Sequence, residues 1–150
     1  MALIVAAGTE TLQAMSFADI TADQDLIVGA QHHIYTVLST IVFCVSIGSA
    51  GDVYELLILG HDQFGDVTTQ ANPMIIAKVV AVGNQTFVFN DKFSFNGFSS
   101  AAYTEPMSTN AEQATIAQQG GSVAQRYQIH PLDTAVITDV TVTFIDQNNA

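Results

Sequence analysis

Apolar and polar residues alternate with a period of two along several stretches of this chain, and this pattern constrains the fold more than any other feature. It is clearest in Thr86–Phe95, Ser122–His130 and Thr134–Asp146. Successive side chains of a strand point to opposite faces of a sheet, so the alternation predicts strands with one buried face. The side chains expected on the buried faces are Phe87, Phe89, Phe93, Phe95, Val123, Tyr127, Ile129, Val136, Val140, Val142 and Phe144.

Three further stretches are apolar on both faces: Ile34–Ile47, Val53–Leu59 and Met74–Val82. Strands without a polar face usually lie at the centre of a sheet or under a covering element. With few helices expected in this chain, a partner subunit is a natural cover.

Turn signals separate these stretches. Gly48–Asp52 and His130–Asp133 are expected to end strands, and Gly83-Asn84 is typical of a tight hairpin. One short helix is expected near residues 110–119, because Thr109-Asn110-Ala111-Glu112 matches a capping box and Gly120-Gly121 would end the helix. Thr9–Phe17 fits a strand or a helix.

The predicted fold is therefore all-β. Short strands at this spacing indicate a two-sheet β-sandwich, of which the jelly roll is one form. The 150 residues fit a single domain over 1–150, with residues 1–7 as an N-terminal arm.

Charge excludes one class of function and favours another. The chain has a net charge of −11 and three cations, Lys78, Lys92 and Arg126, which is too few for binding a nucleic-acid backbone. Charged residues make up 11% of the chain, against about 25% in typical soluble domains. So little charge leaves apolar surface uninterrupted, and we expect that surface to be covered in a homo-oligomer or other assembly.

A membrane-spanning helix is not expected. Such a helix needs about 20 apolar residues, and the longest apolar run, Tyr35–Ile47, is shorter and contains several Ser and Thr residues. No basic residue precedes the apolar stretch Met1–Ala7, so no secretion signal is expected either.

Candidate sites for chemistry are few. Two loops are rich in Asp, one around Asp19–Asp25 and one around Asp62–Asp66. Neither matches the spacing of an EF-hand, so we expect no resident metal or cofactor. His32-His33 would point to opposite faces of a strand, and Cys44 lies within an apolar run that predicts a buried thiol. We therefore expect no enzymatic activity. The residues that would serve a looser calcium site are Asp19, Asp23, Asp25, Asp62 and Asp66.

In overall character the chain resembles a capsid decoration (cement) protein of a tailed bacteriophage: short, β-rich, poor in cysteine, and rich in Ala, Thr, Val, Gln and Asn. The resemblance implies a homo-oligomer, made in the host cytoplasm, that binds the major capsid protein on the outer surface of the virion. It also implies subunit contacts through edge strands and the N-terminal arm, by strand addition. The arm residues expected to make these contacts are Ala2, Leu3, Ile4 and Val5.

Two alternatives stay open. One is a calcium- or glycan-binding β-sandwich, such as a lectin or a fibre tip, for which Tyr54, Tyr103, Asp62 and Asp66 would be the residues to test. The other is an enzyme on a cupin-like barrel, but the spacing of His61 with Glu55, or of His32 with His130, does not reproduce a cupin ligand set.

Overall fold

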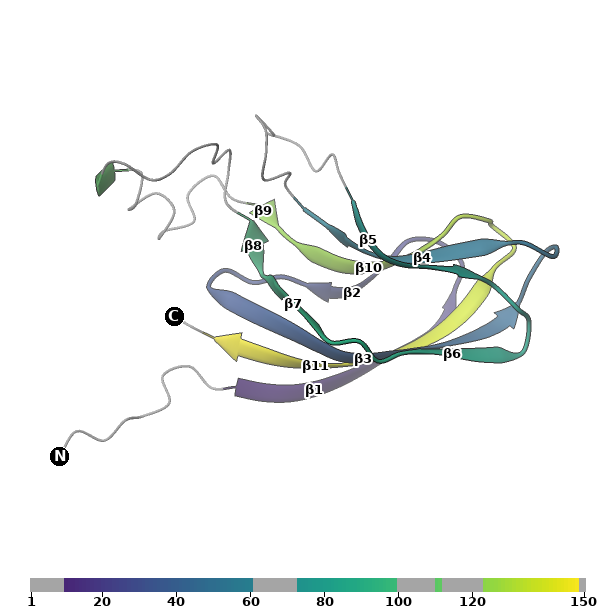
Figure 1. The fold of residues 1–150 in the computed structure, drawn as a ribbon, viewed down its shortest axis with the longest axis horizontal. Helices are drawn as coiled ribbons and strands as arrows, with labels where there is room; N and C mark the ends of the chain where they lie inside the picture. The colour runs from purple at the N-terminus through teal and green to yellow at the C-terminus, as the bar shows by residue number, and fades with distance from the viewer. Residues whose placement is uncertain (1–9, 61–72, 100–109, 112–122, 149–150) are drawn as a thin grey trace.

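The fold is a sandwich of two antiparallel β-sheets (Figure 1). The computed structural model describes residues 10–60, 73–99, 110–111 and 123–148. Sheet A has the order β1 (Glu10–Ile20), β11 (Ile137–Asn148), β3 (His33–Ser46), β6 (Gln85–Phe89), with β7 (Phe93–Asn96) also paired to β3. Sheet B has the order β2 (Gln24–Val28), β10 (Arg126–Pro131), β4 (Val53–Leu59), β5 (Met74–Val80), and a small pair joins β8 (Phe98–Ser99) to β9 (Val123–Ala124). The prediction of an all-β, two-sheet sandwich is confirmed.

The core lies between the two sheets and contains most of the side chains that the alternation predicts; Phe87 is only partly buried and outside it, and the side chain of Val123 lies outside the described residues. Val140 pairs with Val42 across β11 and β3, and both side chains are buried. Tyr127 and Ile129 of β10 face them from sheet B and are fully buried. The predicted inward face of the Phe-rich stretch is confirmed for Phe89, Phe93 and Phe95, which belong to or pack against the core.

One hydrogen bond links the sheets inside this core. Thr40 Oγ1 of β3 and the Tyr127 hydroxyl of β10 lie 2.7 Å apart, and both side chains are fully buried. Burial raises the pKa of Tyr127 to about 12, because removal from water disfavours the phenolate. The two hydroxyls therefore satisfy one another where water is excluded.

Two of the three stretches without a polar face are central strands, as predicted. Ile34–Ile47 corresponds to β3, between β11 and β6, and Val53–Leu59 is β4, between β10 and β5. Met74–Val82 is not central, because β5 lies at the edge of sheet B among the described strands, and its expected cover by a partner subunit stays a prediction. Ile76, Ala77 and Val79 pack against the core, but other apolar side chains of β5 are exposed, with 51% of Met74 and 61% of Val80 accessible to solvent.

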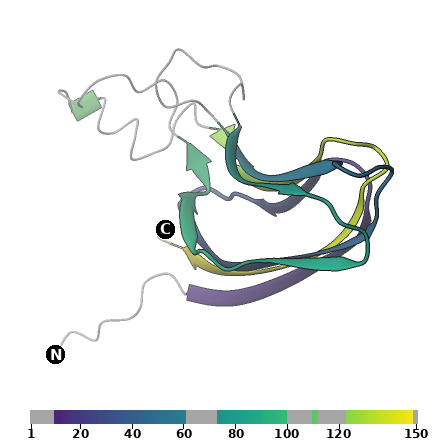
Figure 2. The same ribbon diagram turned by 45° about the vertical axis from the view of Figure 1, so that its right-hand side comes forward.

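Most connections carry the chain from one sheet to the other (Figure 2). The predicted hairpin at Gly83-Asn84 is wrong for this reason, since β5 belongs to sheet B and β6 to sheet A. Asn84 adopts a left-handed conformation (φ 60°), and its backbone N donates to the carbonyl of Cys44 at 2.8 Å. That bond fastens the crossing to the end of β3. Predicted strand Thr86–Phe95 is divided in the structure into β6 and β7, both of which pair with β3.

The ambiguous stretch Thr9–Phe17 is a strand in the structure, since β1 begins at Glu10. Of the predicted helix near 110–119, only residues 110–111 are described, so that helix stays a prediction. The arm 1–7 and the loops that contain Asp62, Asp66 and Tyr103 also lie outside the described residues. No helix within the described ranges is long and apolar enough to cross a membrane.

Candidate interaction surfaces

The longest exposed edge of the sandwich is β1. Among the described strands this eleven-residue strand pairs in sheet A only with β11, from Glu10 opposite Gln147 to Ile20 opposite Thr138. Its other edge therefore presents backbone N–H and C=O groups outward. Thr11–Ala18 contains no charged residue and no proline, and 70% of Leu12 is exposed.

Proteins usually protect such edges with charges, prolines or bulges, because a bare edge pairs with other chains. The protection on β1 is confined to its end, where the register shifts between Phe17 and Ile20. Asp19 there has φ 53°, and its backbone N donates to Asp139 Oδ1 at 2.8 Å. Most of the edge is thus open to strand addition.

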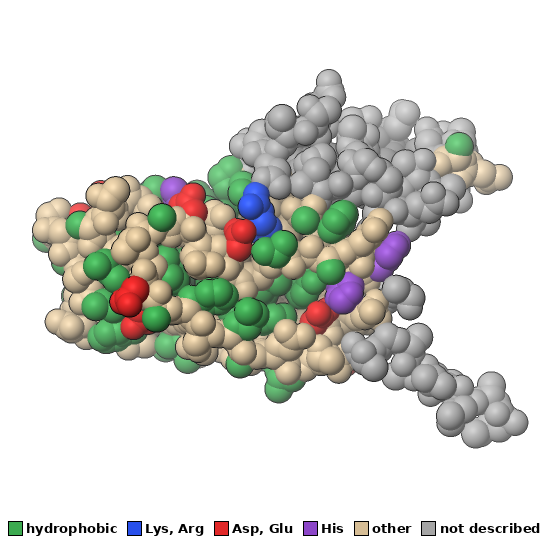
Figure 3. All heavy atoms as spheres, turned by 180° about the vertical axis from the view of Figure 1, so that it is seen from behind, with side chains coloured by type: hydrophobic (Ala, Val, Ile, Leu, Met, Phe, Trp, Pro, Cys, Tyr) green, Lys and Arg blue, Asp and Glu red, His purple; other side chains and the backbone are tan. Residues whose placement is uncertain are grey.

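A groove separates β1 from β2, the neighbouring edge strand of sheet B. It has a volume of about 330 Å³, with walls from both edges and a floor that reaches into the sandwich. Apolar side chains dominate its lining: Met15, Phe17, Leu26, Ile27, Val28, Tyr35 and Phe144. Figure 3 shows hydrophobic side chains gathered on this side of the molecule, with the few charged groups around them.

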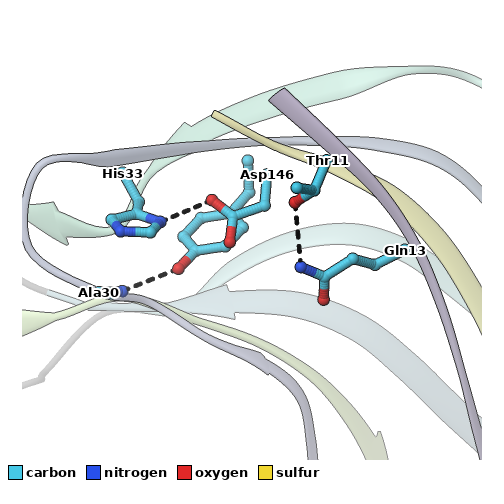
Figure 4. A network of polar contacts seen from close by, with 6 residues as sticks. Thr11, Gln13, Ala30, His33 and Asp146 are labelled. Carbon is cyan, nitrogen blue, oxygen red and sulfur yellow. Dashed lines mark hydrogen bonds and ion pairs between the residues drawn. The ribbon is translucent and has the colours of Figure 1, made fainter. Parts of the chain in front are cut away.

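A polar network closes one end of this groove (Figure 4). His33 Nδ1 lies 2.6 Å from Asp146 Oδ1, which ties the start of β3 to the end of β11. The Tyr35 hydroxyl accepts a hydrogen bond from the Ala30 backbone N at 3.0 Å, and the His33 ring stacks on Tyr35. Burial raises the pKa of Tyr35, so its hydroxyl stays neutral at ordinary pH. On β1, Gln13 Nε2 donates to Thr11 Oγ1 at 3.2 Å.

The outer face of sheet A carries almost no charge. Register and burial place alternate residues of its strands on this face, including the exposed apolar side chains Leu12, Ile41, Phe43 and Val88. Hydroxyl side chains lie among them, and Ser16 bonds Thr141 at 3.1 Å. Within the described strands of this face the charged residues are Glu10 and Asp139, near opposite ends of the sheet, and the exposed residues Asp91 and Lys92 lie between β6 and β7 at its far edge.

The outer face of sheet B differs, because it holds ion pairs. Asp25 accepts a hydrogen bond from Gln128 Nε2 at 2.9 Å and lies 3.5 Å from Arg126 Nη1. Lys78 Nζ approaches Glu55 Oε1 to 3.7 Å on the neighbouring strands. Two of the chain's three cations are thus neutralised on this face.

Of the acidic residues proposed for a looser calcium site, Asp62 and Asp66 lie outside the described residues, and the other three do not converge. Asp19 lies at the end of β1, Asp23 bonds His130, and Asp25 bonds Gln128. A calcium ion requires six to eight oxygen ligands around one point. No group of three His, Cys, Asp or Glu side chains suited to a metal occurs within the described ranges.

Cys44 and the turn that contains Ser49 have structural roles. Cys44 is buried, as predicted, and its Sγ lies 3.5 Å from the Ser46 carbonyl; burial raises the pKa of its thiol, which disfavours the reactive thiolate. Ser49 Oγ donates to Asp52 Oδ1 at 2.9 Å, and Asp52 Oδ2 accepts the backbone N–H groups of Gly48 and Ser49. Hydrogen bonds from Ser49 lower the pKa of Asp52, so this carboxylate organises the turn between β3 and β4.

Sequence reasoning left β1 ambiguous and so missed the most exposed edge. One signal was present, since Glu10–Ile20 carries charge only at Glu10 and Asp19. The groove between β1 and β2 left no such signal, because it is lined by residues from four strands, some more than a hundred positions apart.

No known family model and no curated protein matches this chain. Among solved structures it is similar to a chain from Bacillus endospore appendages, described as a novel family of disulfide-linked pili. The TM-score is 0.40 at 10% sequence identity, and the alignment covers 100% of this chain and 98% of that chain.

Proposed function

We propose that this protein is a structural subunit of a homo-oligomeric assembly. The observation that carries the proposal is the long, uncharged edge of β1, which the described part of the chain leaves unpaired on one side. An edge of this kind promotes pairing with another chain. A protein that stays monomeric would be expected to interrupt it.

The surface of sheet A supports the same proposal. A chain with a net charge of −11 repels other acidic chains over most approaches. On the β1 side of the outer face of sheet A the described charges lie near the two ends of the sheet, so contact there opposes few like charges. Exposed side chains such as Leu12, Ile41 and Val88 would gain burial in such a contact.

We further infer that the sandwich is a jelly roll. β1 pairs with β11, β2 with β10, β3 with β6, and β4 with β5. These are the pairs expected when one long hairpin is rolled into two sheets. Jelly rolls serve in viral capsid proteins and in lectins, so the fold is compatible with an assembly role without assigning one.

The specific form of the proposal is a capsid decoration protein that binds the major capsid protein on the outer surface of a phage head. Its support is the chain's composition together with the acidic charge, which suits an outer position over contact with packaged DNA. A gene for a major capsid or portal protein beside the gene for this chain would support this form. A position among unrelated metabolic genes would contradict it.

Native mass spectrometry and light scattering on the purified chain test the assembly role. We expect oligomers whose population grows with protein concentration, and a monomer at every concentration would overturn the proposal. Deletion of Met1–Ala7 is expected to weaken assembly while the melting temperature and the far-ultraviolet circular dichroism stay those of the full chain. Unchanged assembly of the shortened chain would remove the N-terminal arm from the proposal.

A further inference from the structure

We propose that β1 of one copy pairs antiparallel with β1 of a second copy, so that two copies of sheet A form one continuous sheet. This inference rests on the proposed homo-oligomer and names the contact that forms it. The partner is a second copy of this chain, because the geometry of β1 satisfies the requirements of symmetric self-pairing.

The other edges of the sandwich suit this contact less well. On the far side of sheet A, β6 has five residues and β7 four, and the two are separate strands. In sheet B, β2 has five residues and carries Asp25, whereas β5 has Lys78 and a register shift against β4. Among the described edge strands only β1 combines eleven residues with an uncharged middle, and strand addition gains backbone hydrogen bonds in proportion to length.

Symmetry then restricts the register. A twofold axis perpendicular to the sheet keeps inner faces on one side, so residues that share a face must pair with one another. On β1 the outer face holds Leu12, Ala14 and Ser16, whose partners in β11 lie on the outer face of sheet A. An axis through Ala14 meets this condition and sets Leu12 of each copy opposite Ser16 of the other.

This register also suits the charge of the chain. Glu10 and Asp19 lie at the two ends of β1, and the axis at Ala14 sets Glu10 opposite Ala18. No two carboxylates of β1 then lie directly opposite each other. Leu12, 70% exposed in one copy, would be covered by the strand of the second.

Charged substitutions at the axis give a direct test. Ala14→Lys sets two lysines opposite each other, and Ala14→Glu sets two glutamates, so each variant alone is expected to self-associate at least about tenfold more weakly than the wild type. An equimolar mixture of the two variants should restore association as a mixed dimer, because opposite charges then meet across the axis. The matched control is Thr86→Lys, an exposed site on the opposite edge of the same face, which should associate as the wild type does.

The outcomes separate this inference from the proposed function. If the wild type associates and both Ala14 variants associate equally well, the β1 contact is overturned while the assembly role stands. Failure of the mixture to restore association, with each variant folded by its melting curve, also overturns it, since a head-to-tail contact would behave in this way. If the wild type is a monomer, both proposals fall.

A cysteine variant checks the same contact without charge. Directly opposed residues of antiparallel strands have Cα atoms about 4.5–5.5 Å apart, within the range that a disulfide spans. Ala14→Cys is therefore expected to give a covalent dimer under mild oxidation, whereas Thr86→Cys should stay monomeric in denaturing gels. Native Cys44 is 3% exposed and should not interfere. A covalent dimer of the Thr86 variant without one of the Ala14 variant would place the contact on the other edge and overturn the inference.

Discussion

Removal of the Tyr127 hydroxyl tests whether the two sheets are joined by the buried hydrogen bond to Thr40. The oxygens lie 2.7 Å apart, and both residues are fully buried. Tyr127→Phe keeps the ring and its edge-to-face contact with Phe93 at 5.2 Å, so the change isolates the hydroxyl. Thr40 Oγ1 would then lie in the core without this partner.

The expected cost is that of an unsatisfied buried polar group. Loss of one partner from such a pair lowers the free energy of unfolding by about 1–3 kcal/mol, whereas replacement of both by apolar groups of similar shape is close to neutral. We therefore expect Tyr127→Phe and Thr40→Val each to destabilise by about 1–3 kcal/mol. The double variant should be less destabilised than the sum of the two, and nearly as stable as the wild type.

Urea unfolding of the wild type, the two single variants and the double variant measures this double-mutant cycle. In a thermal scan the melting temperature should fall by about 2–4 °C for each kcal/mol of stability lost. Thr138→Val is a matched control on β11. Thr138 is fully buried, and its Oγ1 has no hydrogen-bond partner among the described residues. This change should leave stability unchanged or raise it. Additive losses at Thr40 and Tyr127, with no coupling, would refute the reasoning.

Two further predictions concern backbone packing and pH. A Cβ atom on Gly97 would lie 2.0 Å from the carbonyl oxygen of Ala30, so Gly97→Ala should lower the free energy of unfolding in urea by more than about 2 kcal/mol. The control is Gly83→Ala, where the nearest atom to the new Cβ is 3.9 Å away and the expected loss is less than about 1 kcal/mol. Equal losses would contradict the packing argument. Because the pKa of Tyr127 is about 12 when folded and 10.0 when exposed, the unfolded chain loses this proton first as pH rises. The contribution of Tyr127 to the free energy of unfolding should therefore be fully present below pH 10 and should be lost between pH 10 and 12. The free energy of unfolding of Tyr127→Phe should fall less steeply with pH over that range. Equal slopes for the variant and the wild type would count against a buried phenol.

For the stretches with clear alternation, the sequence alone determined that strands form and which face of each is buried. Val140, Val142 and Phe144 were expected inward and are buried, and Tyr127 and Ile129 behave in the same way. The physical reason is local, because alternation along a strand follows from the pleat of the backbone and needs no knowledge of the partner strand. The same local rule predicted a two-sheet sandwich.

Only the tertiary structure decided which strands lie side by side. Glu10 pairs with Gln147, nearly the whole chain away, and no local pattern encodes that contact. Apolar runs did not distinguish the central strand β4 from the edge strand β5, and Gly83-Asn84 has the composition of a hairpin turn although it crosses between sheets. Because edge and centre differ only in what lies beyond the strand, the exposed edge of β1, on which the proposed assembly rests, became visible only once all the pairings were known.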